Sequence, residues 1–519
     1  MLLVSSLLAN VASALLLLFL LPFATAIEQS PPNANHIFNA LHASMRQWGS
    51  SLHHNGMSFF LATVPKGTQL YHGGYSRDPV NGTEWLAFEP EHAMVFTKPF
   101  PHGPPPPREG SDGTEIPPPP TKENEGASGA PGGWLHTYTA ANDLRLLYAD
   151  GMSAGKTGNG TLDSQDRILF RDALSGHPFE QEKKRADLFC RMVREDWKDR
   201  LDGIIRMEAG FEIILCDFAR NLDRVRVTQV KSDHKPQNMR HRLGPRPGKG
   251  QKELDGARLW FRAIAARYDG IGGNRVTLNY DTFVTTYAYG LDLFRSPDGG
   301  ISGLPRLKHL SADELEPIRA DLNKLIMDHD TKALSFNWQS IADMVVDRYA
   351  RELRYLASGQ LSTIDEIHEE IESSLGPFID YSDRNASNEI DRCTAQFLPA
   401  AESTESTAGG AVRLVAHRIC ATLIDIWTQS DYETALVDIQ KLMKYLSWTT
   451  WKECGGCADN EICVVPMWPM GTVEDYDHPQ CREASRPNGD GRRYWGGSGA
   501  PSSLSWFQRL SHSLQTIMW

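Results

Sequence analysis

The chain has 519 residues and a formal net charge of −12, with 40% hydrophobic and 23% charged residues. A chain of this length and apolar content can build two or three domains with buried cores, which excludes disorder throughout. The acidic balance argues against a general polyanion binder, so no nucleic-acid partner is expected.

The first 26 residues are predicted to form a signal peptide. An uncharged apolar run from residue 2 to residue 23 ends in Ala24, Thr25 and Ala26, and the first charged side chain is Glu28. This small-x-small ending suits signal peptidase, and the segment after it lacks the flanking charge of an anchoring helix. The alternative is an uncleaved membrane anchor, because residues 7–23 are nearly long enough to span a bilayer. We expect a secreted, extracellular protein that keeps no stable membrane span after cleavage.

The cysteines predict disulfides, because an even number of them follows the signal peptide into an oxidising compartment. They are Cys190, Cys216, Cys393, Cys420, Cys454, Cys457, Cys463 and Cys481. Closeness in the chain favours Cys393 with Cys420 and two bridges among the last four, which leaves Cys190 with Cys216. Spacing does not prove this connectivity, and a four-thiolate zinc site is the alternative for the last four. Three sequons, at Asn81, Asn159 and Asn385, are candidate N-glycosylation sites.

The expected fold class is α+β, and its first part is a mixed α/β domain at residues 27–305. Apolar patterning predicts strands at 57–64, 68–71, 84–88, 135–138, 144–148 and 211–218, and a β-rich stretch at 275–294. Helices are expected at 37–48, from residue 90, at 187–197 and at 259–267. A proline- and glycine-rich insertion interrupts the domain at 99–133, and a basic run at 231–252 is expected to be a solvated loop.

A helical domain is predicted at residues 306–447. Capping boxes at Ser311 with Glu314 and at Thr363 with Glu366 indicate helix starts. Apolar side chains repeat every three or four residues along 338–356, and further helices are expected at 412–427 and 432–446 after a polar linker at 402–410. Residues 448–495 then form a cysteine-rich cap that is too small to fold without cross-links, and residues 496–519 form a tail with one apolar side.

The strongest candidate site lies in the α/β domain. Tyr71, His72 and Gly73 end one predicted strand, and the segment 84–93 reads as a second strand that leads into a helix. This pattern resembles the start of ADP-ribosyltransferase-like domains, in which a strand ending in Tyr-His-Gly presents a histidine to the nicotinamide ribose. In that fold the following helix carries an alanine and an aromatic residue, and Ala93 and Phe96 fall at this step.

That fold also needs a carboxylate on a later strand, and the run 211–215 resembles the catalytic-glutamate strand. The resemblance implies that His72 binds and orients NAD and that Glu212 is the catalytic carboxylate. It places Tyr71 and Gly73 at the cofactor, with Trp85 or Tyr138 stacking on nicotinamide. In the alternative interpretation these residues are structural, and Glu212 simply pairs with a buried arginine such as Arg206.

Other motifs carry less chemistry. Residues 155–166 look like the second half of an EF-hand loop, with Asn159, Asp163 and Asp166 at ligand positions, but Gly155 and Thr157 replace the carboxylates that should start the calcium cage. The same stretch is one residue too short for a phosphate-binding loop. No His-Glu-x-x-His motif occurs in the sequence.

Three segments, 71–96, 150–166 and the cysteine-rich region 454–481, resemble a group of uncharacterised secreted proteins of filamentous fungi. This resemblance implies origin and compartment without naming a reaction. We therefore expect a secreted binding factor or a wall- or host-interaction factor, and the alternative is an ADP-ribosyltransferase-like enzyme that uses NAD. The two are distinguished by whether the side chains of His72 and Glu212 face a common open pocket lined by aromatic residues.

Overall fold

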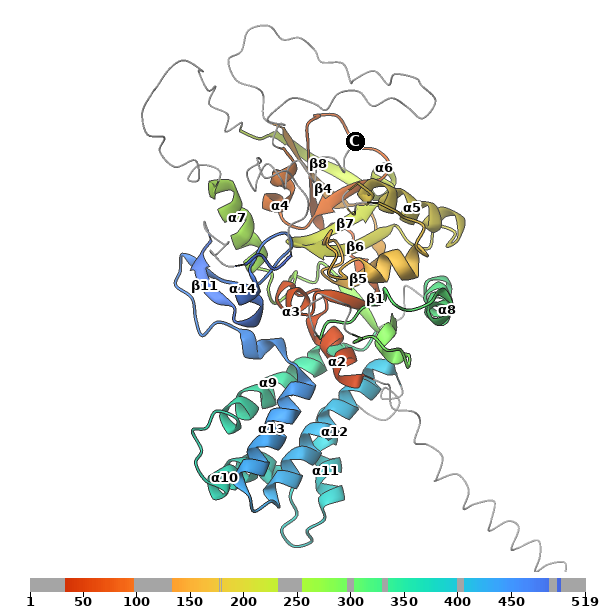
Figure 1. Ribbon diagram of the computed structural model, residues 1–519. Helices are drawn as coiled ribbons and strands as arrows, with labels where there is room; N and C mark the ends of the chain where they lie inside the picture. The colour runs from red at the N-terminus through yellow and green to blue at the C-terminus, as the bar shows by residue number, and fades with distance from the viewer. Residues whose placement is uncertain are drawn as a thin grey trace, which may run out of the picture.

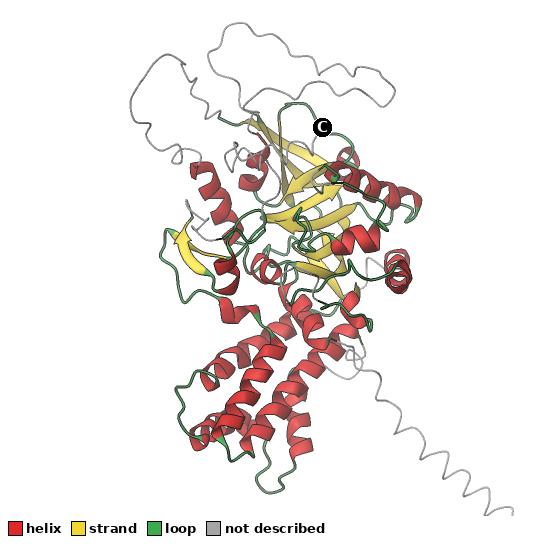
Figure 2. Ribbon diagram, in the orientation of Figure 1, coloured by secondary structure: helices red, strands yellow, loops and turns green. Residues whose placement is uncertain are grey.

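The computed structural model describes residues 33–97, 133–176, 178, 180–231, 254–295, 303–328, 335–398, 406–484 and 492–495. It shows a large mixed sheet with helices, a bundle of long helices below it, and a small disulfide-bonded module at its side (Figures 1 and 2). The predicted fold class is therefore confirmed. The predicted signal peptide, nearly all of the insertion and of the basic run, and the tail lie outside the described residues.

The sheet has nine strands in the order β8-β4-β2-β3-β7-β6-β5-β1-β9. Neighbouring strands are antiparallel except for the parallel pair β5 and β6. The strands are β1 (Asn55–Val64), β2 (Gln69–Gly74), β3 (Glu84–Ala87), β4 (Trp134–Ala140), β5 (Leu144–Gly151), β6 (Gly203–Glu208), β7 (Gly210–Leu215), β8 (Leu222–Gln229) and β9 (Thr277–Thr285). The predicted strands correspond to β1–β5, β7 and β9, whereas β6 and β8 were not predicted.

Alternate side chains of the strands enter two different cores, as the two-residue period of a strand requires. On one face, Phe60 and Ile213 pack in the core that continues into the helical bundle. On the other face, Phe59 and Ile214 pack with helices α5 (Glu182–Glu195) and α8 (Ala312–Asp328). The helices around the sheet are α2 (Ala34–Ala43), α3 (Gln47–Leu52), α4 (Pro90–Met94), the π-helix η2 (Ser164–Leu169), α5 (Glu182–Glu195), α6 (Phe218–Asn221), α7 (Leu254–Ala265) and α8 (Ala312–Asp328), with short 3-10 turns η1 (Val95–Thr97) and η3 (Thr286–Ala288).

One helix predicted at 37–48 is in fact two, α2 and α3. Between them Met45 adopts a φ of 52°, a left-handed conformation that cannot continue a right-handed helix. Helix α2 is tied to the bundle, because Asn39 donates a hydrogen bond of 2.9 Å to the carbonyl of Leu446. Helix α3 instead packs toward the sheet, where Gln47 donates to the carbonyl of Glu208 at 2.9 Å.

The helical bundle contains α9 (Trp338–Leu356), α10 (Ile364–Leu375), α11 (Ala386–Ala395), α12 (Thr407–Trp427) and α13 (Tyr432–Leu446), with the 3-10 turn η4 (Gly376–Phe378). The capping box of Thr363 and Glu366 starts α10 as predicted. The predicted linker at 402–410 is too long, because α12 begins at Thr407 with Ser406 as its N-cap. Helix α8 shares a core with the sheet, and Trp197, which follows α5, donates a hydrogen bond of 2.9 Å to the side chain of Asn323 on α8. The domain division at residues 305 and 306 stays a prediction.

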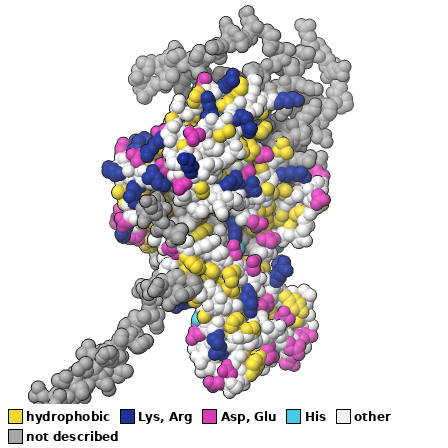
Figure 3. All heavy atoms as spheres, turned by 180° about the vertical axis from the view of Figure 1, so that it is seen from behind, with side chains coloured by type: hydrophobic (Ala, Val, Ile, Leu, Met, Phe, Trp, Pro, Cys, Tyr) yellow, Lys and Arg dark blue, Asp and Glu magenta, His cyan; other side chains and the backbone are white. Residues whose placement is uncertain are grey.

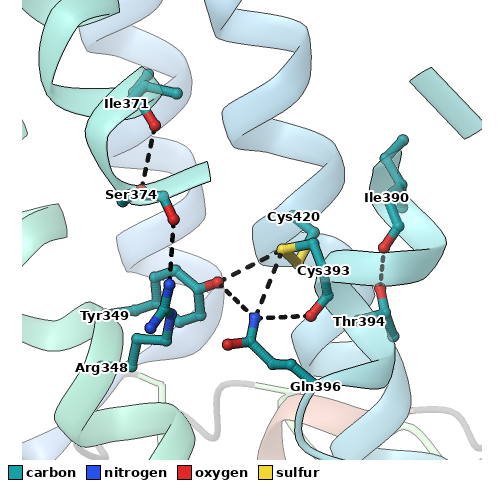
Figure 4. Close-up of a disulfide and its surroundings, with 9 residues drawn as sticks. All are labelled: Arg348, Tyr349, Ile371, Ser374, Ile390, Cys393, Thr394, Gln396 and Cys420. Carbon is teal, nitrogen blue, oxygen red and sulfur yellow. Dashed lines mark hydrogen bonds between the residues drawn. A yellow bond between two sulfur atoms is a disulfide. The ribbon is translucent and has the colours of Figure 1, made fainter. Parts of the chain in front are cut away.

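The disulfides are Cys190–Cys216, Cys393–Cys420, Cys454–Cys463 and Cys457–Cys481. This confirms the expected pairing and uses all four sulfurs of the alternative zinc site. Cys393–Cys420 joins α11 to α12, and the hydroxyl of Tyr349 on α9 lies 3.5 Å from the Sγ atom of Cys393 (Figure 4). The bridge therefore lies where three helices of the bundle meet.

The C-terminal module consists of η6 (Thr449–Lys452), β10 (Glu461–Val464), α14 (Val473–Asp477) and β11 (Gln480–Glu483). Its strands form an antiparallel hairpin, and two disulfides close it. Side chains of the hairpin share an apolar core with Trp260 and Ile264 of α7. Among the helices that the structure describes, none has both the length and the apolar content to cross a bilayer. On the face shown in Figure 3, basic and acidic side chains are interspersed over the upper part of the molecule.

Candidate functional site

A pocket lies between strands β2, β3 and β7, helix α4 and the loop after β5, and it holds about 450 Å³ of empty space. That space includes the open mouth of the pocket, and the cavity volume accessible to a water-sized sphere is about 30 Å³. The lining residues are Tyr71, His72, Gly73, Trp85, Leu86, Ala87, His92, Ala93, Phe96, Lys156 and Glu212. Five of the six residues predicted for catalysis or cofactor binding therefore line one pocket, together with further aromatic and charged side chains.

The register of the strands explains why Glu212 reaches this pocket. Tyr71 pairs with Ala87, Ala87 pairs with Glu212, and Glu212 pairs with Arg206. Directly opposite residues of neighbouring strands point to the same face of a sheet. Glu212 and Tyr71 therefore belong to one row of side chains, with the small Ala87 between them.

Helix α4 lies against this row at Gly73. A Cβ atom at Gly73 would lie only 1.9 Å from the carbonyl oxygen of Ala93. The close contact between strand and helix thus requires glycine at this position. It brings α4, with Ala93 and His92, to the wall of the pocket.

His72 follows Tyr71 in β2, so its side chain belongs to the opposite face of the sheet. Its Nδ1 atom donates a hydrogen bond of 2.8 Å to the carbonyl of Trp85, and its ring centroid lies 5.8 Å from that of Phe218. Burial lowers the pKa of His72 to about 4, so the ring is neutral. His72 and Glu212 share the pocket lining, but their side chains leave the sheet on different faces.

Tyr138 does not line the pocket. Its pairing with Leu70 places it on the same face as His72, where its ring lies 5.6 Å from that of Phe218. The side chain is 4% exposed and belongs to the core shared with the bundle. Stacking of Tyr138 on a ligand in this pocket is therefore incompatible with its position, and Trp85 is the stacking candidate that remains.

The carboxylate of Glu212 pairs with Arg206, as the structural alternative expected. The Nε atom of Arg206 donates 3.1 Å to the Oε1 atom of Glu212, and its Nη2 atom contacts the same oxygen and also Glu182 of α5. Both contacts use Oε1, and the structure gives the Oε2 atom no hydrogen bond to any residue that it describes. Arg206 therefore fixes the orientation of Glu212 and leaves its second oxygen available.

Burial opposes ionisation of Glu182, but Arg206, Lys156 and Arg185 outweigh it and lower its pKa to about 2. Arg206 itself is fully buried, and although burial disfavours its charge, Glu182 and Glu212 raise its pKa. The network is thus a set of compensated charges beside the pocket. Such groups hold their geometry only while the partners are present.

A second buried ion pair lies next to it. The Nζ atom of Lys156 donates 2.8 Å to the Oε2 atom of Glu208, and the two side chains are 1% and 2% exposed. The ammonium group also lies 4.0 Å from the Oε1 atom of Glu182 and 5.3 Å from the ring centroid of Trp468 in the C-terminal module. Lys156 lines the pocket and supplies the positive charge of its lining.

His92 completes the wall on the α4 side. It is 3% exposed and stacks on Trp260 of α7 with ring centroids 5.8 Å apart. Burial lowers its pKa to about 4, although Glu212 acts in the opposite direction. His92 and Lys156 were not predicted as site residues. His92 lies in the segment 84–93, from which the site was predicted. Lys156 lies in the glycine-rich loop that resembles part of an EF-hand loop and of a phosphate-binding loop but completes neither motif.

The EF-hand-like loop has its carboxylates engaged by arginines. Asp163 accepts 2.9 Å from the Nε atom of Arg306, and Asp166 accepts 2.8 Å from the Nε atom of Arg185. These ion pairs explain the acidic residues of the loop without calcium. At the sequons, Asn81 and Asn385 are exposed and Asn159 is half-buried, and their glycosylation stays a prediction.

Comparisons with known proteins concern the first part of the chain. Residues 27–130 and 109–241 match the family model described as the YPL277C N-terminal domain. The chain is 36% identical over 218 residues to "Uncharacterized protein YOR389W" of Saccharomyces cerevisiae, which covers 38% of this chain and 34% of that protein. It is 35% identical over 217 residues to "Uncharacterized protein YPL277C" of the same yeast, with 38% and 43% covered.

The chain thus spans less than half of the length of these two relatives. No solved structure matches it. All residues that line the pocket fall between 71 and 212, inside the matched region, whereas Trp468 falls outside it. The part of the chain that carries the pocket is therefore similar to an uncharacterised fungal protein family.

Proposed function

We propose that the pocket binds NAD through its nicotinamide ribose and that the protein transfers or hydrolyses ADP-ribose outside the cytosol. The observation that carries this proposal is the position of Glu212. Its carboxylate lines an aromatic pocket beneath α4, in one strand row with Tyr71 of the Tyr-His-Gly segment. The resemblance to ADP-ribosyltransferase-like domains implies a carboxylate at this place, whereas the histidine that it assigns to NAD leaves the sheet on the other face.

Aromatic surface and the carboxylate of Glu212 support a cationic ligand. The buried groups around them, Arg206, Lys156, Arg185, Glu182, Glu208 and Glu212, are three cations and three carboxylates, so the formal charge of the network is compensated. The nicotinamide ring of NAD is positively charged, and such rings are attracted to aromatic faces and to carboxylates in a partly desolvated pocket. Trp85 and Phe96 supply aromatic surface on the lining.

In the proposed reaction, Glu212 stabilises the charge that develops on the ribose as nicotinamide leaves. Cleavage breaks the bond between the ribose C1′ atom and the nicotinamide nitrogen, and the electron pair leaves with nicotinamide. Positive charge then develops on the ribose, and the fixed carboxylate of Glu212 stabilises that charge. The Oε2 atom is available to accept a hydrogen bond from a ribose hydroxyl, because both contacts of Arg206 use Oε1. The neutral ring of His72 contributes to the shape of β2 rather than to this charge.

Nicotinamide release from labelled NAD tests the proposal. The wild-type protein is expected to release nicotinamide, and Glu212→Gln is expected to lower the rate about 100-fold or more, since it removes the charge and keeps the shape. Glu369→Gln on the exposed side of α10 is the matched control and is expected to leave the rate unchanged. Equal rates for Glu212→Gln and the wild type, or no NAD binding by calorimetry, would overturn the proposal.

Export is part of the proposal and is supported by the four disulfides, which are typical of oxidising compartments. Mass spectrometry of the mature protein from culture medium is expected to find Ile27 at its N-terminus. A protein that keeps residues 1–26, or that is recovered from the cytosol with free thiols, would contradict it. The interpretation as a binding or wall-interaction factor stays a prediction, and NAD that is bound but never cleaved would favour it.

A further inference from the structure

The proposed reaction needs a group that takes the proton of the attacking nucleophile, and most titratable side chains of the pocket are unsuited to this task. His72 leaves the sheet on the other face. His92 stacks on Trp260, and burial lowers its pKa to about 4, which makes it a weak base. Burial raises the pKa of Tyr71, so its phenol stays protonated. In the proposed function the carboxylate of Glu212 contacts Arg206 through one oxygen and the ribose through the other, so it is not the base for the nucleophile.

The pair of Lys156 and Glu208 has the geometry that the task requires. Lys156 comes from the loop after β5 and lines the pocket, whereas Glu208, the last residue of β6, does not line it. Their 2.8 Å hydrogen bond connects the pocket to a carboxylate that is 2% exposed. The indole ring of Trp468 lies beside the ammonium group and restricts its movement.

We propose that Lys156 and Glu208 form a proton relay that deprotonates a neutral O–H nucleophile, water or a hydroxyl group, in the pocket. This inference rests on the proposed function and names the nucleophile class of the same site. Lys156 touches the nucleophile and is the catalytic residue of the relay, whereas Glu208 acts through it as a positioning residue and proton store.

Protons and electrons balance in this step. The oxygen of the nucleophile forms a bond to C1′ of the ribose, while the bond from C1′ to the nicotinamide nitrogen breaks and neutral nicotinamide leaves. The O–H bond of the nucleophile breaks, and its proton goes to Lys156 as Lys156 passes another proton to the Oε2 atom of Glu208. The positive charge of NAD is thus replaced by a proton on Glu208, which solvent removes after the product has left.

The surroundings of Glu208 set the pH at which the relay works. Burial raises the pKa of Glu208 to about 7, while Lys156 acts to lower it and Glu212 and Glu182 act to raise it. Lys156 lies in the loop after β5, Glu212 on β7 and Glu182 on α5. Three other neighbours complete the surroundings: Arg206 on the same strand, His92 of α4 beside Glu212, and Gln47 of α3, which donates a hydrogen bond to the backbone carbonyl of Glu208. Only the ionised carboxylate accepts a proton, so the relay is active above pH 7 and fails as pH falls below it.

Nicotinamide release in water, measured from pH 5.5 to pH 8.5, tests the relay. The wild-type rate is expected to be about tenfold lower at pH 6 than at pH 8, as for one essential group that titrates near pH 7. Glu208→Gln is expected to lose about 100-fold or more at pH 8 and to lose this pH dependence. Lys156→Met, in which a neutral Glu208 faces an apolar side chain, is expected to give the same flat profile.

Glu182→Gln is the matched control, because Glu182 is equally buried and lies in the same cluster but makes no hydrogen bond to Lys156. It is expected to keep a pH dependence of the same form, with the midpoint moved to lower pH because Glu182 no longer raises the pKa of Glu208. A Glu208→Gln or Lys156→Met protein that releases nicotinamide with the wild-type pH profile would overturn the relay and leave the proposed function intact. A wild-type protein that releases no nicotinamide at any pH would overturn both.

Discussion

Replacing Arg206 by methionine removes a cation that joins Glu182 of α5 to Glu212 of β7. The three side chains are 0%, 0% and 6% exposed. Methionine fills much of the space but leaves two buried carboxylates without their shared partner. Removal of one member of a buried ion pair costs about 3–5 kcal/mol of folding free energy. We expect the free energy of unfolding of Arg206→Met to fall by this amount at pH 7.

The pKa of Glu182 gives an independent magnitude and a pH dependence. Burial opposes ionisation, but Arg206, Lys156 and Arg185 together outweigh burial and lower this pKa from 4.5 to about 2, which corresponds to about 3 kcal/mol of stabilisation, and Arg206 is the largest of the three contributions. A depressed pKa stabilises the folded state fully above pH 4.5, and this contribution is lost as pH falls toward 2. Acidification therefore reduces the difference in free energy of unfolding between the wild-type protein and Arg206→Met. At pH 3 this difference is expected to be about half or less of its value at pH 7.

Urea unfolding followed by tryptophan fluorescence at the two pH values measures both effects, because Trp197 and Trp260 are buried around this sheet. Arg171→Met is the matched control, since its ion pair with Glu316 is exposed on both sides and contributes little. This variant is expected to unfold with the wild type. Arg206→Met unfolding at the wild-type urea concentration at pH 7, or an equal loss at both pH values, would refute the reasoning.

Three further outcomes follow from the same contacts. Gly73→Ala places a Cβ atom 1.9 Å from the carbonyl oxygen of Ala93, so it is expected to lower the free energy of unfolding by about 1–3 kcal/mol and to weaken NAD binding. Gly158→Ala is the control, because the space around Gly158 is open, and it is expected to change neither quantity. Thermal melting measures the stability and calorimetry measures the affinity. Trp468→Leu removes the ring beside Lys156 and is expected to lower nicotinamide release about 3- to 10-fold, and an unchanged rate would show that the C-terminal module does not support the site. Mild reductant is expected to open Cys454–Cys463 and Cys457–Cys481, which are half-exposed, before the buried bridge Cys393–Cys420. Mass spectrometry of the alkylated protein measures the order. Earlier opening of Cys393–Cys420 would contradict this expectation.

Most of the sheet was predictable because its strands carry apolar side chains in a pattern that the chain itself displays. Strand β6 was not, since the charged Arg206 and Glu208 interrupt its apolar run, although every position of the strand is buried. Strand β8 was missed for the opposite reason, because it lies at the edge of the sheet and is exposed at most positions. The break between α2 and α3 depends on the backbone of Met45, which no apolar period reveals.

The site was predictable only in part. The resemblance located Glu212 and the Tyr-His-Gly strand. Because successive side chains of a strand point to opposite faces of a sheet, the sequence also implies that Tyr71 and His72 lie on different faces. Which of the two shares a face with Glu212 depends on the register of β2, β3 and β7, and that register comes from tertiary packing. Lys156 and His92 reach the pocket from a loop and a helix that no strand pattern could connect to Glu212.

The central claim is that the pocket beside Glu212 is an NAD site. A crystal structure of the protein with NAD tests it most directly, using Glu212→Gln to keep the ligand intact. We expect nicotinamide ribose between Trp85 and residue 212, beneath α4, with the residue 212 side chain at a ribose hydroxyl. An empty pocket at saturating NAD, or NAD bound elsewhere on the protein, would contradict it.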